Sequence, residues 1–244
     1  MANVIFHTDK GIAVPAVTAD QMREIDRIPI EETGPNLFQM MENAGRNLAS
    51  LTIELLGNYW QRASVVVLAG TGGNGGGGIC AARHLANRGV RVRLCITEPE
   101  RLGTVPSLQR KICQSTPGEE VSLEQLSEMK VDIVLDAVLG YSLNGAPRGR
   151  ALDLIRWANV SGIPILSLDI PSGIDATTGE TPGEHVRSRW TMTLALPKTG
   201  LLPKSTGELF LADIGIPVGV YRDLGLPYTS PFDHRYVVPL KARP

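Results

Sequence analysis

Hydrophobic residues follow a helical spacing over the first quarter of this chain. Between residues 35 and 57 they recur every three or four positions and form one apolar stripe: Leu37, Met40, Met41, Ala44, Leu48, Leu51 and Leu55. This spacing predicts an amphipathic helix with Pro35 in its first turn and Gly57 at its C-terminal cap. A capping box at 18–21 predicts an earlier helix, which Pro29 should end or kink.

From residue 63 onward, short runs of β-branched and aliphatic residues alternate with amphipathic segments. The runs predict buried strands at 63–69, 90–96, 131–137, 164–170, 190–196 and 208–214. The segments between them predict helices at 79–89, 105–115, 122–129 and 151–160. This alternation indicates an α/β fold with a mostly parallel sheet covered on both faces. We expect one domain over residues 1–244, with residues 1–17 as an N-terminal arm.

Composition and charge restrict the classes of partner. The 244 residues are 43% hydrophobic and 20% charged, with a net charge of -1, so we expect no general attraction to nucleic acid or to an anionic membrane. The three cysteines are odd in number and widely spaced, which favours reduced thiols in a cytoplasmic protein. We expect neither a signal peptide nor a membrane span, because the apolar runs are too short.

The glycine-rich stretch AGTGGNGGGG, residues 69–78, allows three interpretations. It could be a flexible linker, but its position between a buried strand and a helix argues against that. It could be the G-x-G-x-x-G fingerprint of an NAD-dependent oxidoreductase, with Glu98 as the ribose-binding acid. Asn74 inside the turn, a helix expected to start only at 79, and two preceding helices argue against the fingerprint. The third interpretation is a wide loop whose backbone N–H groups line an anion pocket.

Polar side chains follow several of the predicted strands. Asn74, Asp136, Asp169 and Ser172 all come at or just after strand ends. Since the carboxyl ends of parallel strands share one edge of a sheet, these groups should meet there. An amide, a carboxylate and a hydroxyl suit a hard cation, whereas no His or Cys accompanies them to favour zinc or iron. The alternative is that the two aspartates only cap the loops that follow them.

Several segments, in order, resemble the NAD(P)H-hydrate epimerases, the YjeF N-terminal domain family. These segments are QMREIDRIPIEETG, MMENAGRNLA, AGTGGNGGGGICAARHLANRGVRV, DAVLGYSLNGAPRG, LDIPSGIDATTGE, LALPKTGL and ELFLADIGIP. The resemblance implies a three-layer αβα Rossmann-like sandwich with a mostly parallel central sheet, often as a homodimer. It also implies epimerisation of the R and S forms of NADH or NADPH hydrated at C6, a repair reaction that works alongside a separate dehydratase.

The same resemblance implies roles for individual residues. It places a potassium ion on Asn74, Asp136 and Ser172, and it makes Asp169 a substrate contact and our candidate acid–base residue. The remaining substrate-binding positions lie in two loops: Gly73, Asn74, Gly75, Gly76 and Gly77, and then Gly140, Tyr141, Ser142, Leu143, Asn144, Gly145 and Ala146.

The glycine loop departs from the family at two positions. The family's loop typically reads N-N-G-G-D-G, whereas this chain has Gly73 and Gly77 in place of the first asparagine and the aspartate. This departure leaves open a catalytically impaired nucleotide-binding or scaffold protein on the same fold. An NAD-dependent oxidoreductase is supported only by the fingerprint match and Glu98.

Other chemistry-bearing residues have two interpretations each. Cys80 and His84 share one helix face, and the thiol is either acidified near a helix N-terminus or a small buried residue packed on the sheet. Lys198 either meets a phosphate or is solvated. Glu42 and Asn43 either face the pocket or lie on the helix surface.

Overall fold

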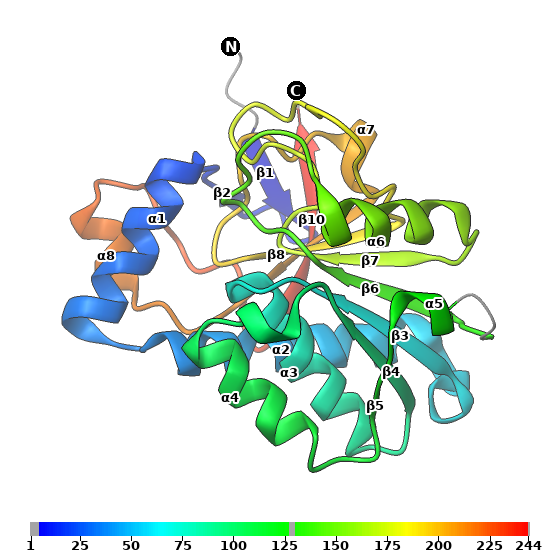
Figure 1. Ribbon diagram of the computed structural model, residues 1–244. Helices are drawn as coiled ribbons and strands as arrows, with labels where there is room; N and C mark the ends of the chain where they lie inside the picture. Colours follow the sequence, from blue (N-terminus) through cyan, green and yellow to red (C-terminus); the bar gives the residue numbers. More distant parts are fainter. Residues whose placement is uncertain (1–4, 127–129, 244) are drawn as a thin grey trace.

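The computed structural model describes residues 5–126 and 130–243 (Figure 1). Its strands are β1 Ile5–Thr8, β2 Ala13–Val14, β3 Ser64–Ala69, β4 Arg91–Ile96, β5 Glu119–Glu120, β6 Ile133–Ala137, β7 Ile165–Leu168, β8 Trp190–Leu194, β9 Glu208–Ala212 and β10 Val237–Arg243. Its α-helices are α1 Ala19–Ile28, α2 Leu37–Leu56, α3 Gly73–Ala86, α4 Thr104–Cys113, α5 Leu123–Leu126, α6 Gly149–Val160, α7 Pro203–Thr206 and α8 Val218–Asp223.

The strands form one ten-stranded sheet in the order β2-β1-β10-β9-β8-β7-β6-β3-β4-β5. Strands β3 to β9 all pair in parallel, and only β1, β2 and β10 at one edge pair antiparallel. Helices α2, α3 and α4 cover one face of the sheet, and α6 lies on the opposite face (Figure 1). This arrangement confirms the predicted α/β sandwich with a mostly parallel sheet.

The predicted N-terminal arm is wrong for the residues that the structure describes, and residues 1–4 lie outside them. Residues 5–17 instead contribute β1, β2 and a bridge from Val17 to Lys198. Strand β10 was not predicted either, and it joins β1 to the parallel part of the sheet through β9. These short strands gain their stability from partners distant in sequence, so local periodicity did not reveal them.

Several predicted boundaries also differ. The strands expected to reach residues 170 and 196 stop at Leu168 and Leu194, because Asp169 (φ 65°) and Ala195 (φ 60°) turn into the left-handed region. The helix expected at 122–129 is the short α5, and residues 127–129 lie outside the described part of the chain.

The largest difference concerns the helix expected at 79–89, which begins six residues earlier, at Gly73, and includes the glycines. A Cβ at Gly78 would lie 2.5 Å from Ala137 Cβ, and a Cβ at Gly77 would lie 2.8 Å from Leu168 Cδ2. Gly76 faces the Met41 side chain at similarly close range. Each glycine costs helix propensity, but only glycine lets α3 pack this tightly against the sheet and α2.

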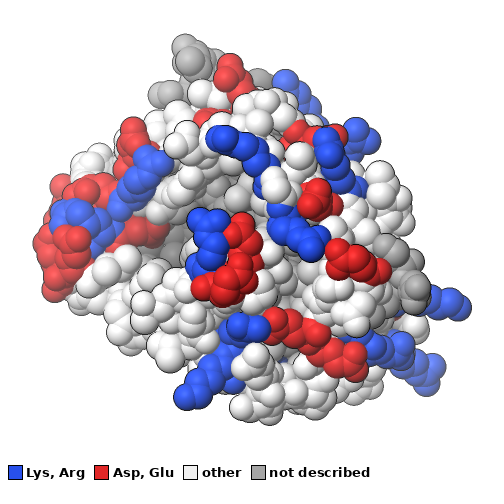
Figure 2. All heavy atoms as spheres, in the orientation of Figure 1, with Lys and Arg blue, Asp and Glu red and all other residues white. Residues whose placement is uncertain are grey.

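On the face shown in Figure 2, basic and acidic side chains are interspersed. Arg27 illustrates the pattern, because its guanidinium pairs with Glu24, Glu31 and Glu32. A search of the described residues found no helix with the length and apolar character that crossing a membrane requires.

The packing of α3 predicts opposite effects for two glycine-to-alanine substitutions. Gly78→Ala should lower the free energy of unfolding by about 1–3 kcal/mol, because its methyl group overlaps Ala137. Gly73→Ala, in the same helix but with no atom within 4 Å of the added Cβ, should leave stability unchanged or raise it by up to about 1 kcal/mol. Urea unfolding of both variants checks this, and equal stabilities would contradict the packing explanation.

Candidate active site

A cavity of about 650 Å³ opens at the carboxyl ends of the parallel strands. Residues at or just after the ends of β3, β4, β6, β7, β8 and β9 contribute to its wall, together with α1, α2 and the first turns of α3. This is the position at which ligands bind in open parallel sheets, and the volume lies in the range of small-molecule sites.

Most of the predicted substrate-binding residues lie in the wall of this cavity. Those that line it are Gly73, Asn74, Gly77, Gly140, Tyr141, Ser142, Leu143, Asn144, Ala146 and Asp169. Gly75, Gly76 and Gly145 do not line it: the first two are buried in α3, and Gly145 turns the loop after β6 with φ 73°. The structure therefore brings both predicted loops together at one site.

Asp136 and Ser172 lie buried among the strand ends rather than in the cavity wall. Asp136 Oδ1 accepts the Ser172 hydroxyl at 2.5 Å, and Oδ2 accepts the Ser172 amide at 2.9 Å and the Ser167 hydroxyl at 2.7 Å. Burial raises the pKa of Asp136, although hydrogen bonds from Ser172 and Ser167 act in the opposite direction.

Hydrogen bonds to Leu139, in the loop after β6, link Asn74 to Ser172. Its amide nitrogen donates to the Leu139 carbonyl at 3.1 Å, and the Leu139 amide donates to the Ser172 hydroxyl at 2.8 Å. Asn74 Oδ1 is buried and has no hydrogen-bond partner among the described residues. A buried acceptor without a partner is costly, so this oxygen is available to a hydrogen-bond donor or a cation.

Asp169 forms a buried ion pair with Lys198. The Lys198 ammonium group bonds Asp169 Oδ1, donates to the Leu194 carbonyl at 3.0 Å and is fully buried. The interpretation of Lys198 as a solvated residue is therefore wrong, and Asp169 engages its charge. The positive φ of Asp169 costs conformational energy, which the surrounding hydrogen bonds must offset.

A second carboxylate lines the same cavity, and sequence reasoning missed it. Asp26 of α1 accepts a hydrogen bond from the Tyr141 hydroxyl at 2.6 Å. Burial raises the pKa of Asp26, while the bond from Tyr141 acts in the opposite direction. A sequence signal was present, because Asp26 lies four residues after the buried Met22 and so shares its helix face.

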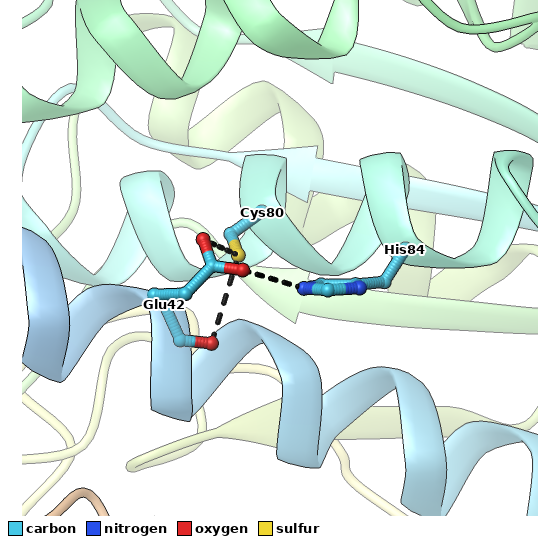
Figure 3. A group of neighbouring side chains, drawn as sticks. All are labelled: Glu42, Cys80 and His84. Carbon is cyan, nitrogen blue, oxygen red and sulfur yellow. Dashed lines mark hydrogen bonds and ion pairs between the residues drawn. The ribbon is translucent and has the colours of Figure 1, made fainter.

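Cys80 and His84 meet Glu42 in a polar cluster between α2 and α3, outside the cavity wall (Figure 3). Arg83 donates to both Glu42 oxygens, at 2.6 and 2.5 Å, and His84 Nε2 lies 2.8 Å from Glu42 Oε1. Burial works to raise the pKa of Glu42, but the bonds from Arg83 and His84 outweigh it and lower the pKa to about 2. The Arg83 guanidinium already supplies the cationic partner of this cluster.

The environment of Cys80 makes its thiol unreactive. Burial and the neighbouring Glu42 raise the pKa of Cys80 to about 12, so the thiol is not acidified. It packs against Gly45 of α2, not on the sheet as expected. Asn43 also serves structure, because its amide donates to the Ile214 carbonyl at 3.0 Å.

The structure also decides between interpretations of the glycine stretch. The linker interpretation is wrong, because residues 73–78 are helical and largely buried. The late helix start that argued against the oxidoreductase fingerprint is wrong as well, because α3 begins directly after Gly72. Glu98 does line the cavity, and it pairs with Arg101 at 2.5 Å.

The sheet, the helix N-terminus at its carboxyl edge and the adjoining cavity define a Rossmann-like small-molecule-binding protein. The chain belongs to the family described as YjeF-related protein N-terminus, whose model matches residues 37–200. It is 54% identical to the NAD(P)H-hydrate epimerase of Dehalogenimonas lykanthroporepellens, over 97% of each chain. It is 38% identical to the NAD(P)H-hydrate epimerase of Truepera radiovictrix, over 88% of this chain and 97% of that one.

The fold has also been seen in a crystal structure. Yeast ynu0, YNL200c, superimposes with a TM-score of 0.80 over 93% of this chain and 100% of the yeast chain, at 21% sequence identity. At that identity the similarity concerns the fold alone.

The buried ion pair predicts a large effect on stability. Lys198→Met should lower the free energy of unfolding by about 3–5 kcal/mol, because it leaves the Asp169 carboxylate buried without its cation. The exposed Lys204→Met should change stability by less than about 0.5 kcal/mol. Chemical denaturation measures both. A Lys198→Met protein as stable as the control would contradict the pairing.

Proposed function

We propose that this protein epimerises the R and S forms of hydrated NADH and NADPH (NAD(P)HX) in the repair of nicotinamide cofactors. The supporting observation is a cavity that unites Asp169 with both predicted substrate loops, in a chain 54% identical to a protein named NAD(P)H-hydrate epimerase. The activity is that of an isomerase, and no redox step is involved.

The reaction requires C6 of the hydrated ring to become planar. Loss of the C6 hydroxyl leaves a cation delocalised through the ring nitrogen, and water then adds to the opposite face. In this proposal the Asp169 carboxylate stabilises the cation. Two groups hold that carboxylate in place. The Leu194 amide donates to it directly, and the Leu194 carbonyl accepts from Lys198, the cation paired with Asp169.

The N-terminus of α3 supports binding of the phosphate groups. Gly72, Gly73 and Asn74 line the cavity where α3 begins, and unpaired N–H groups in the first turn of a helix attract anions. Substrate phosphates would meet this end, while the nicotinamide ring lies toward Asp169.

We also propose potassium as the cofactor, held by Asn74, Asp136 and Ser172. These residues fit a hard cation: they offer oxygen donors, and Asn74 Oδ1 is buried without a partner in the part of the chain that the structure describes. Asp136 is fully buried among neutral partners, so a cation beside it would supply the missing counter-charge. Bound there, potassium would order the loops after β3 and β6.

The assembly and setting of the protein are further proposals. The family resemblance supports a homodimer that works in the cytoplasm alongside a separate NAD(P)HX dehydratase. The three cysteines are buried thiols, which is compatible with a reducing compartment.

A scaffold or catalytically impaired nucleotide-binding protein remains the second candidate. Gly77 offers no side chain to the cavity, and Leu168 Cδ2 fills the space beside it. Gly73 faces open space, so no side chain from this position reaches a ligand. Nucleotide binding without turnover would favour this candidate, and hydride transfer with unmodified NAD would favour an oxidoreductase.

Epimerase activity is tested with mixed R and S hydrated NADH and an S-specific dehydratase. The protein should accelerate consumption of the R form. Asp169→Ala should reduce this acceleration by about 10²–10⁴-fold, as expected for loss of an acid–base or charge-stabilising group. Asp223→Ala, an exposed carboxylate of α8, is the matched control and should keep full activity. Normal turnover by a folded Asp169→Ala variant would refute the assigned role.

The potassium proposal is tested by thermal unfolding in KCl against choline chloride at equal ionic strength. Saturating potassium should raise the melting temperature, with about 2.7 kcal/mol of stabilisation at a hundred times its Kd. Asn74→Ala should abolish the difference between the two salts, whereas the exposed Asn87→Ala should retain it. The same melting temperature in both salts for the unsubstituted protein would contradict the proposal.

A further inference from the structure

Three carboxylates line the cavity, and the proposed chemistry uses only Asp169. Glu98 is paired with Arg101, which leaves Asp26. We propose that Asp26, held by Tyr141, is the residue that gives the proton to the departing C6 hydroxyl and recovers it when water adds. This inference rests on the proposed epimerase activity and divides its work between two aspartates.

The first argument is position. Helix α1 stands beside α8 at one end of the sheet (Figure 1), and Asp26 is the residue through which α1 reaches the cavity wall. Tyr141, from the loop after β6, also lines the cavity and bonds Asp26 Oδ2 at 2.6 Å. The two residues are 115 positions apart in sequence, so the contact joins two separate walls of the site.

The second argument is that the two carboxylates have contrasting partners. The partner of Asp169 is a buried ammonium group, so the two form a charge-assisted hydrogen bond. The partner of Asp26 is a neutral phenol, and burial raises the pKa of Asp26. Paired acidic groups whose environments differ in this way commonly take different roles in catalysis.

Ionisable groups from several elements surround Asp26. Lys198, in the loop after β8, works to lower the pKa of Asp26, and Asp169, after β7, works to raise it. Two further ionisable groups lie nearby. The charge of Asp26 works to raise the pKa of Tyr221 in α8. Arg23 of α1 works to lower the pKa of Tyr141, the partner of Asp26. Lys198 is thus shared between two aspartates and already bonds one of them.

The proton transfer balances without another reactant. Protonated Asp26 gives its proton to the C6 hydroxyl, the C6–O bond breaks, and its electron pair leaves with the water molecule. The ring cation that remains faces the Asp169 carboxylate. A water molecule then adds to the opposite face of C6, and the proton that it releases restores protonated Asp26.

The pH dependence follows from the role as an acid. Asp26 must carry its proton, so turnover should fall as pH rises through the pKa of Asp26. Tyr141→Phe keeps the ring but removes a donor that stabilises the carboxylate form. The pKa of Asp26 should then rise further, and the falling limb of the pH profile should move to higher pH.

The experiment compares kcat and KM of four proteins over a range of pH, with the uncatalysed rate subtracted at each pH. Asp26→Asn should lower kcat by about 10²-fold or more, change KM little and remove the falling limb that Asp26 produces. Asp20→Asn, the matched substitution at an exposed position of the same helix, should behave as the unsubstituted protein. Tyr141→Phe should retain measurable activity with its limb displaced to higher pH.

The outcomes separate this inference from the proposed function. An unsubstituted protein without epimerase activity overturns the proposed function itself. An active unsubstituted protein together with a folded Asp26→Asn variant within about threefold of its kcat overturns only the role of Asp26. If Asp26→Asn does not fold, Tyr141→Phe decides: an unmoved pH profile overturns the inference, and a displaced one supports it.

Discussion

Close contact between the first turns of α3 and the sheet is the constraint on which the site depends. Gly78 lies against Ala137 of β6, and Gly76 lies against Met41 of α2. This contact brings the N-terminus of α3 to the carboxyl edge of β3 and β6, where its unpaired N–H groups face the cavity. The same contact seats α2 on α3, so its residues Met40 and Met41 form an apolar wall of the cavity.

Three aspartates occupy this edge of the sheet, and their partners set them apart. Asp136 is surrounded by hydroxyl and amide donors, Asp169 by an ammonium group, and Asp26 by a phenol. A carboxylate among neutral donors can accept a bound cation, one on an ammonium group already has its counter-charge, and one on a phenol holds a proton more readily. These environments support the three roles proposed for the aspartates: cation ligand for Asp136, stabiliser of the ring cation for Asp169 and acid for Asp26.

The Glu42 cluster shows that perturbed ionisable groups also serve packing. Glu42 joins Arg83, His84 and Cys80 between α2 and α3, and Gln109 of α4 donates to it at 3.3 Å. The cluster links the three helices on this face of the sheet (Figures 1 and 3). Its charge is balanced by Arg83, whereas Asn74 Oδ1 at the cavity lacks a partner among the described residues. A perturbed pKa by itself therefore does not mark a binding site.

The sequence by itself determined the parallel strands, the long helix α2 and the order of the polar residues at the strand ends. Helical spacing and the continuous apolar runs of strands buried on both faces are local patterns, so a few consecutive residues reveal them. Only the tertiary structure decided the start of α3, the edge strands β1 and β10, and the pairs Asp169–Lys198 and Asp26–Tyr141. The start of α3 depends on room beside other elements, and the pairs join residues 29 and 115 positions apart. Contacts between distant segments, and the burial that changes their charge, exist only once the sheet has assembled.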